Sequence, residues 1–382
     1  MTRNLNRIFI ILCFIAFTLP ALFAHRETGR IAEDENRYYA NPPVLFTDAG
    51  RINPDFPTCY DSWISDNIRL RSVLIRLNAT LRYRLFRRIA RADEQIGADG
   101  ELFFTDDSHL DSYLRRDVLS QEALEEYLDA LQWMSDHFDG QGISLYYIQC
   151  VMKENLYPER YPAGAPRPSA PSAAEQIIRG IDEQTTVRQI HVRDKLTAHS
   201  GERIFYTVTD PGHWNEYGAF LGFSEMIDRV RVDYPEVRPA DLADYVCEED
   251  HSLARICGMP YPVPEDSIHC VLKHPKAVEI SLPELDPELD RRIAFREHTH
   301  YFSCDAAGNN LRILLVGDSF LRMGIKNMVA EHFAETLSID WLNADKLDEI
   351  TALWHPDLII LEKVEDAELM ETFEELVKRG AG

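Results

Sequence analysis

The chain has 382 residues, of which 45% are apolar and 27% charged, so it is long enough for one large globular domain or two smaller ones. This composition excludes wholesale disorder, because so many apolar residues can bury a core. The formal net charge of −24 repels polyanions at long range, which argues against nucleic acid as a partner. An acidic glycan would need a local basic patch.

The first 24 residues have the composition of a targeting segment. Arg3 and Arg7 precede an apolar run of 17 residues, 8–24. A basic start before such a run is typical of a secretory signal peptide, here cleaved after Ala24, and the run is also near the lower limit for spanning a bilayer. We therefore expect residues 1–24 to be a signal peptide or an N-terminal membrane anchor. The rest of the chain is expected in the periplasm or another extracytoplasmic space.

The chain has seven cysteines, a content compatible with the predicted export. Cys13 lies in the apolar leader, and the other six are Cys59, Cys150, Cys247, Cys257, Cys270 and Cys304. An even number in an exported chain permits up to three disulfides. Cys247, Cys257 and Cys270 lie close together in the sequence, which favours a local bridge there. No Cys-x-x-Cys pair occurs, so a structural zinc ribbon is not expected.

Residues 25–95 predict an N-terminal extension that carries a helix. Residues 25–60 are polar and rich in turn-forming residues, whereas 61–91 have a helical period with a basic face. This helix either packs against the rest of the protein or contacts a membrane surface. A second, larger domain is expected over residues 96–382.

Strands and helices are predicted to alternate through this larger domain. The strands are expected at 101–105, 143–151, 203–208, 268–272, 311–317, 338–342 and 357–362. The helices are expected at 120–138, 174–183, 215–231, 321–337, 346–353 and 366–379. A proline-rich stretch at 157–173 is expected to be a loop. This alternation predicts an α/β fold with parallel strands and right-handed crossovers.

The strongest local signal for chemistry is Gly317-Asp318-Ser319. It follows a buried strand and precedes an amphipathic helix, so Ser319 lies where open α/β sheets bind their ligands. The backbone N–H of Ser319 at a helix N-terminus can stabilise an oxyanion, and Gly317 allows a tight turn. Ser319 is therefore a candidate nucleophile. Its alternative role is that of a helix cap.

The second signal lies at Asp210-Pro211-Gly212-His213-Trp214. A serine nucleophile needs a base, and the base needs an orienting carboxylate. Asp210 and His213 can form that pair across the tight turn, with Trp214 shielding it from water. The alternative is a helix cap by Asp210 beside an incidental histidine. Because both segments are expected to follow parallel strands of one sheet, we predict that Ser319, His213 and Asp210 meet as a catalytic triad.

These motifs resemble two blocks of the SGNH hydrolase superfamily, Gly-Asp-Ser for the nucleophile and Asp-x-x-His for the base. Ordinary members carry the serine first, whereas here Asp210 and His213 precede Ser319. This permuted order resembles the alginate O-acetyltransferases of the AlgJ and AlgX type. Further similar segments are 33–45, 56–78, 96–104, 146–162, 209–220 and 356–365. The resemblance implies a three-layer α/β/α fold with a mainly parallel sheet, and a catalytic domain over 96–382.

Two departures from the family pattern bear on the site. The family usually has one residue between the Asp and the His, whereas two stand here, a spacing that matches ordinary SGNH enzymes. Met152 stands where an Asn usually precedes the lysine of a middle motif. Residues expected to bind substrate or the oxyanion are Gly317, Arg322, Asn327, Trp214 and Lys153. No metal and no cofactor are expected.

The resemblance implies acetyl transfer through an acyl-serine. His213 would act as general base on Ser319, with Asp210 fixing its tautomer. The acceptor would be an exopolysaccharide or a cell-envelope glycan. A membrane-embedded acyltransferase partner would supply the acetyl groups, and the N-terminus would hold the chain at the inner membrane. Water as the acceptor would make the same triad a carbohydrate esterase.

Two further interpretations remain open at this point. A chain of this kind can be a non-catalytic glycan-binding protein of a polysaccharide assembly machine. His298 and His300, two residues apart on one strand face, could instead hold a metal together with His191 or His199. The triad accounts for more of the motifs than either alternative.

Overall fold

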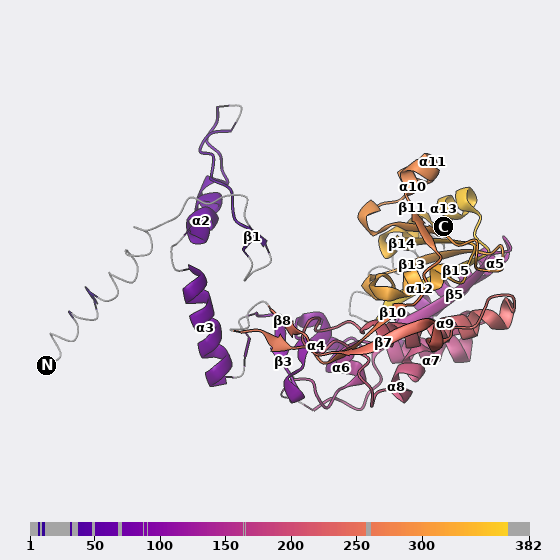
Figure 1. The fold of residues 1–382 in the computed structure, drawn as a ribbon, viewed down its shortest axis with the longest axis horizontal. Helices are drawn as coiled ribbons and strands as arrows, with labels where there is room; N and C mark the ends of the chain where they lie inside the picture. Colours follow the sequence, from indigo (N-terminus) through magenta and orange to yellow (C-terminus); the bar gives the residue numbers. More distant parts are fainter. Residues whose placement is uncertain are drawn as a thin grey trace. The chain divides into compact units, whose positions relative to one another are not determined.

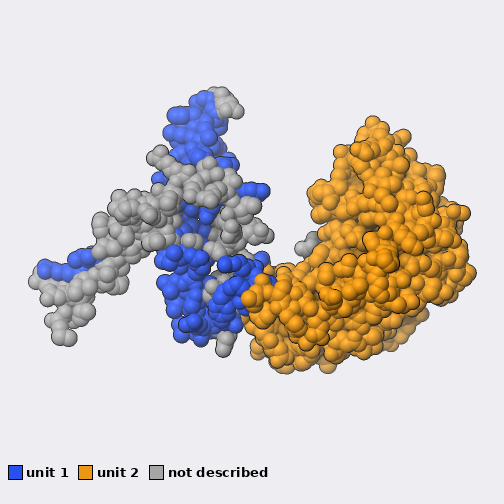
Figure 2. All heavy atoms as spheres, viewed as in Figure 1, with its two compact units in different colours: residues 1–92, 254–263 blue, residues 93–253, 264–382 orange. Residues whose placement is uncertain are grey.

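The computed structural model describes residues 7, 10–11, 31–32, 37–47, 50–67, 71–86, 88–89, 91–162, 164, 166–256 and 261–365. The chain divides into two compact units, residues 1–92 with 254–263 and residues 93–253 with 264–382 (Figure 2). The second unit begins near the boundary predicted at residue 96. Most of the expected leader at 1–24, Cys13, Cys257 and the helix expected at 366–379 lie outside the described residues.

The described residues of the first unit include two short strands and two helices. β1 (Ile31–Ala32) pairs with β2 (Arg37–Tyr38). α3 (Arg71–Phe86) lies in the stretch 61–91 for which the sequence predicts helix, whereas α2 (Phe56–Asn67) begins before it, in the stretch expected to be rich in turns. The buried carboxylate of Asp66 accepts a hydrogen bond from the Ala40 N–H at 2.7 Å. Within the described ranges, no helix combines the length and apolar character needed to span a bilayer.

A seven-stranded sheet forms the centre of the second unit. Its order is β11 (Val278–Ile280), β12 (His300–Ser303), β14 (Glu335–Asp340), β13 (Arg312–Gly317), β15 (Leu358–Val364), β5 (Ser144–Cys150) and β6 (Arg188–Ile190). The five strands from β14 to β6 run parallel, and β12 and β11 add an antiparallel edge. In Figure 1 strands β13, β14 and β15 lie side by side.

Helices cover both faces of this sheet. Every residue from Ile313 to Val316 of β13 is fully buried, and alternate residues face opposite layers. Leu314 and Val316 pack with α5 (Gln121–Asp139), α7 (Ala173–Gln184) and α13 (Leu347–Trp354). Ile313 and Leu315 pack with α8 (Val192–Ala198), α9 (Glu216–Asp233) and α12 (Lys326–Ala330). The predicted three-layer α/β/α fold with a mainly parallel sheet is confirmed.

Two hairpins and several short elements complete the second unit. β3 (Glu94–Ile96) pairs with β4 (Leu102–Phe104), and β7 (Tyr245–Asp250) pairs with β10 (Ser267–Leu272). A Cys247–Cys270 disulfide closes the second hairpin, which confirms the expected local bridge. Other short elements of this unit include α4 (Asp107–Tyr113), α6 (Lys153–Leu156), α10 (Leu282–Leu285) and α11 (Pro287–Arg292). β8 (Leu253–Ala254) pairs with β9 (Val263–Pro264) where the chain leaves and re-enters the unit.

Two predicted elements are wrong. Residues 203–208 form no strand and make only an isolated bridge, between Phe205 and Trp214. Several of their backbone groups bind the side chains of Lys153 and Glu265. The prediction also missed both edge strands of the sheet, β6 and β11, and the neighbouring β12. The helix expected over 321–337 ends at Ala330, because β14 begins at Glu335. Gly324, with φ +106°, kinks its first turn.

Candidate active site

Ser319 lies directly after the central strand of the sheet. β13 ends at Gly317, and Ser319 opens the helical segment that continues as η4 (Leu321–Ile325) and α12. The Asp318 carboxylate accepts hydrogen bonds from the Phe320 N–H at 2.9 Å and from the Val364 N–H at 2.8 Å. Asp318 therefore ties this turn to the end of β15. The Ser319 N–H belongs to the first helical turn, where backbone donors lack partners within the helix.

The structure brings the three predicted triad residues into one chain of hydrogen bonds. His213 Nε2 lies 2.7 Å from Ser319 Oγ, and His213 Nδ1 lies 2.8 Å from Asp210 Oδ2. Nδ1 donates its proton to the carboxylate, so in the neutral ring Nε2 is left to accept from the serine hydroxyl. The side chains of His213 and Asp210 are 20% and 22% exposed, so a ligand can reach them.

The surroundings of Asp210 keep its carboxylate charged. Burial alone would raise the pKa of Asp210, but the hydrogen bonds from the His213 ring and from two backbone N–H groups outweigh burial. The Gly212 and His213 N–H groups each lie 2.9 Å from Asp210 Oδ1. The net effect holds the pKa of Asp210 below its usual value. One oxygen thus orients the imidazole while the other fixes the turn.

A buried glutamate positions the segment that leads into Asp210. Glu265 Oε1 accepts from the Thr207 N–H at 2.7 Å and from its hydroxyl at 3.0 Å. Glu265 Oε2 accepts from the N–H groups of Val208 and Thr209, at 3.1 and 2.7 Å, and from the Thr209 hydroxyl at 2.8 Å. Burial would raise the pKa of Glu265, but these bonds lower it below the usual value. Sequence reasoning missed Glu265, because no motif marks it.

Lys153 holds the same segment from another side. Its ammonium donates to the Leu102 carbonyl at 2.9 Å and to the Tyr206 carbonyl at 2.7 Å, and lies 3.5 Å from Glu101. Burial lowers the pKa of Lys153 to about 8, although the charge of Glu101 opposes this shift. The side chain has no exposed surface, so the structure does not support Lys153 as a substrate-binding residue. It joins β4 to the loop before Asp210.

Phe320, which the sequence analysis missed, covers the imidazole. Its ring centroid lies 4.9 Å from that of His213 and 5.0 Å from that of Trp214. Trp214 is fully buried, and Phe320 is 4% exposed. Trp214 was expected to shield the Asp–His pair, and it supports Phe320 from the core side instead. The only sequence signal for Phe320 was its position directly after the candidate nucleophile Ser319.

Gly317 is required by a close approach, not by the turn that the sequence suggested. It is not among the glycines with positive φ. A Cβ at this position would collide with the carboxyl group of Glu362 on β15. Glu362 Oε2 accepts from the Asp318 N–H at 2.9 Å. Glu362 is fully buried, and burial, reinforced by the charge of Asp318, raises its pKa well above the usual value.

Arg322 and Asn327 differ in their relation to the site. Arg322 donates to Asp340 Oδ2 at 2.7 Å, at the end of the strand next to β13, so it lies at the same sheet edge as Ser319. Asn327 is exposed on α12 and accepts a hydrogen bond from the Lys326 ammonium at 3.4 Å. No hydrogen bond joins Asn327 to the triad in the described part of the chain. The structure therefore does not support Asn327 as an oxyanion donor.

The histidines considered as metal ligands bind separate carboxylates. His298 Nδ1 lies 3.1 Å from Asp340, and His300 Nδ1 lies 2.6 Å from Glu279. Across the described residues, no group of three or more His, Cys, Asp or Glu side chains is arranged to hold a metal ion.

Comparisons with known proteins identify the fold. No family model and no curated protein sequence matches the chain. The structure of Bacillus cereus PatB1 with a sulfonyl adduct matches with a TM-score of 0.52 and 15% identity, over 72% of this chain and 96% of that one. The O-acetyltransferase domain of Pseudomonas putida AlgJ gives a TM-score of 0.47 and 12% identity, over 76% and 100%. Pseudomonas aeruginosa AlgX gives 0.39 and 15%, over 71% and 61%.

The likeness to PatB1 concerns the fold. At 15% identity it leaves the activity of this chain to be argued from its own residues. The chain has a mixed α/β fold with a mainly parallel central sheet, as the SGNH-like interpretation predicts, and shares this fold with PatB1.

Proposed function

We propose that this chain is an acyltransferase that carries an acetyl group on Ser319. The observation behind the proposal is the continuous chain of hydrogen bonds from Asp210 through His213 to Ser319 Oγ, at 2.8 and 2.7 Å. If Ser319 were only a helix cap, a histidine at hydrogen-bond distance would not be needed. If His213 were incidental, the buried side chains that position its segment would have no role. The choice of acetyl rests on the resemblance of the Gly-Asp-Ser and Asp-x-x-His segments to the alginate O-acetyltransferases, and the fold shared with PatB1 agrees with an SGNH-like interpretation.

The geometry defines the first half-reaction. His213 Nε2 takes the proton from Ser319 Oγ as the oxygen attacks the carbonyl carbon of an acetyl donor. The Ser319 N–H is placed to donate a hydrogen bond to the oxyanion that forms. When the tetrahedral intermediate collapses, the bond to the leaving group breaks. His213 then returns the proton to that group, and an acetyl-serine ester remains.

The second half-reaction reverses these roles. A hydroxyl group of the acceptor gives its proton to His213 and attacks the ester carbonyl, which transfers the acetyl group and restores Ser319. Asp210 stabilises the imidazolium that forms in both halves. The proposed acceptor is a sugar hydroxyl of an exopolysaccharide or cell-envelope glycan outside the cytoplasm. The proposed donor is a membrane-embedded acyltransferase, with the N-terminal segment holding this chain nearby.

The test is the intact mass of the purified protein after incubation with an activated acetyl ester. We expect wild type and a Ser200→Ala control to gain the mass of one acetyl group, and Ser319→Ala to gain none. Adding a glycan or only water then separates a transferase from a carbohydrate esterase. Ester turnover that survives in Ser319→Ala would overturn the triad. Absence of both adduct and turnover in wild type, with this ester and with an acetylated donor protein, would favour a glycan-binding protein.

A further inference from the structure

The second unit contains a pocket that the proposed reaction does not use. It has a volume of about 370 Å³, within the range of small-molecule sites. Glu331 and Ala306, which line it, precede β14 and β13, whereas Ser319 follows the carboxyl end of β13. These two strands are parallel, so the pocket and the triad lie at opposite edges of the sheet.

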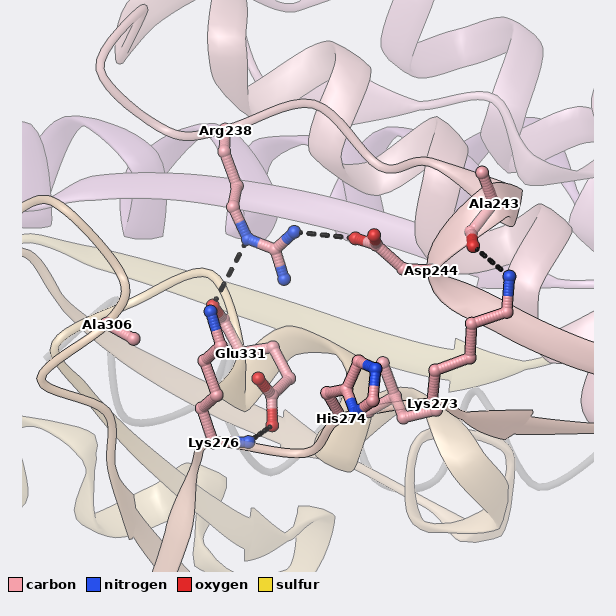
Figure 3. Close-up of a pocket in the computed structure, with 9 residues that line it drawn as sticks. Arg238, Ala243, Asp244, Lys273, His274, Lys276, Ala306 and Glu331 are labelled. Atoms are coloured by element: carbon pink, nitrogen blue, oxygen red, sulfur yellow. Dashed lines mark hydrogen bonds and ion pairs between the residues drawn. The ribbon is translucent and has the colours of Figure 1, made fainter.

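Basic side chains from two segments surround this pocket. Arg238 follows α9, and Lys273, His274 and Lys276 lie in the turn between β10 and β11 (Figure 3). The protein as a whole carries a formal charge of −24, so a pocket lined by three permanent cations differs in sign from most of the chain. A local excess of positive charge raises the local concentration of anions.

The two acids of the pocket are already engaged by the protein. Asp244 accepts from Arg238 Nη1 at 2.8 Å. Glu331 Oε1 accepts from the backbone N–H groups of Lys276 and Ala277, at 2.8 and 2.9 Å. Both carboxylates thereby hold the basic segments in place, which fixes the donors before any ligand arrives.

Several donors remain available for a ligand. Arg238 uses Nη1 for Asp244 and Nε for the Glu331 carbonyl at 3.4 Å, which leaves Nη2. The Lys276 ammonium and the His274 ring are exposed, and neither forms a hydrogen bond or ion pair within the described ranges. A guanidinium beside an ammonium matches the oxygens of a phosphate group, which accept several charge-assisted hydrogen bonds at once.

We propose that this pocket binds an organic phosphate, a phosphate monoester on a small polar group. The free Arg238 Nη2 and the Lys276 ammonium can both donate to the several oxygens of one phosphate, which suits a phosphate better than a single carboxylate. The volume exceeds that of a bare phosphate ion, and Leu272, Ala243 and Ala306 supply apolar surface for the group that bears the phosphate. The proposed phosphate site is separate from the proposed acetyl transfer, because no residue of the triad lines the pocket.

The positive potential also acts on a neighbouring histidine. His332 follows Glu331, and burial lowers its pKa to about 4, with the charge of Arg238 adding to the shift. A phosphate dianion beside Arg238 would offset that charge. Binding is therefore expected to raise the pKa of His332, which gives a second reporter at the pocket.

The test uses the full chain as Ser319→Ala, so that binding is measured without acyl transfer. The probes are glucose 6-phosphate, glucuronate, glucose and inorganic phosphate, each titrated by calorimetry with the His332 ring followed by NMR. We expect glucose 6-phosphate to bind most tightly, and more tightly as the pH rises past about 6, where a phosphate monoester gains its second charge. Adding Lys276→Gln should weaken binding about tenfold, the loss of one charge-assisted contact.

The control is Arg179→Gln on α7, which removes one exposed positive charge far along the chain from the pocket. Arg238→Gln tests the guanidinium, and Lys276→Gln covers the case in which the Arg238 variant fails to fold. Equal affinity for inorganic phosphate would reduce the site to an ion site and overturn the organic ligand. Equal affinity for glucuronate would overturn the phosphate. No binding, or an equal loss in Arg179→Gln, would overturn the pocket as a site.

Discussion

Glu265 and Thr209 are joined by two hydrogen bonds, from the Thr209 N–H at 2.7 Å and from its hydroxyl at 2.8 Å. Thr209 directly precedes Asp210, so a carboxylate from a separate hairpin sets the place of the Asp–His pair. The base of the proposed reaction is therefore positioned by a residue that touches neither substrate nor imidazole.

Replacing Glu265 with Gln tests this dependence. The amide has one acceptor oxygen where the carboxylate has two, so its NH2 group would face N–H donors of the loop. We expect the rate of acetyl-serine formation to fall at least about tenfold, with a loss of about 1–3 kcal/mol in stability. The KM for a small ester should change little. Glu248→Gln, an exposed change on β7 of the same hairpin, should leave the rate unaltered. An unchanged rate in Glu265→Gln would show that the segment before Asp210 keeps its position without the Glu265 carboxylate.

The Cys247–Cys270 disulfide closes the hairpin whose second strand begins just after Glu265. The bridge spans 23 residues, and constraining such a loop in the unfolded chain is worth about 3 kcal/mol. The double variant Cys247→Ser, Cys270→Ser should therefore melt at a lower temperature. It should also form acetyl-serine more slowly. Calorimetry and the mass assay measure both effects. A lower melting point with a normal rate would separate the hairpin from the active site.

Asp210→Asn keeps the size of the side chain and removes its charge. The amide can present its NH2 group to His213 Nδ1, which favours the tautomer with the proton on Nε2. That nitrogen then no longer accepts from Ser319, and we expect kcat to fall by about 10³- to 10⁴-fold. Asp228→Asn, exposed on α9, is the matched control. The ring tautomer can be read by NMR, and a normal rate with the altered tautomer would contradict the proposed role of Asp210.

His332 makes the fold sensitive to acid. Burial lowers its pKa to about 4, whereas an unfolded histidine has a pKa of about 6.5. Between these values the unfolded chain binds more protons, so the free energy of unfolding decreases as the pH falls from about 6.5 to 4. The difference of about 2.5 pKa units corresponds to about 3 kcal/mol at 1.36 kcal/mol each. His332→Phe should flatten this part of the pH profile, measured by denaturant unfolding. An equally steep profile in the variant would assign the sensitivity elsewhere.

Local patterns account for what the sequence could predict. The strand before Ser319 is a continuous apolar run, and the Asp210–His213 turn lies within a few residues, so both were recognisable without a structure. Glu265 could not be predicted, because it is 56 residues from Thr209 in the chain and acts only through the fold. Lys153 was recognised as notable, but its role depends on burial that its neighbours in sequence do not reveal.

The incorrectly predicted elements can also be explained from their residues. Ile204, Phe205 and Val208 are buried, which gives residues 203–208 the apolar content of a strand although they form a loop. β6 has three residues, too few to show a period. Phe333 and Leu337 extend the helical spacing beyond Ala330, but Leu337 belongs to β14. No residue at 331–334 marks the boundary by itself.

Gly317 and Glu362 form a single unit although 45 positions separate them. The carboxyl group of Glu362 occupies the space that any side chain at position 317 would fill. In distant relatives of this chain, a residue larger than glycine after the central strand should therefore appear only where position 362 carries a smaller side chain. Such paired changes at positions 317 and 362 would identify the nucleophile turn in sequences where neither residue is itself conserved.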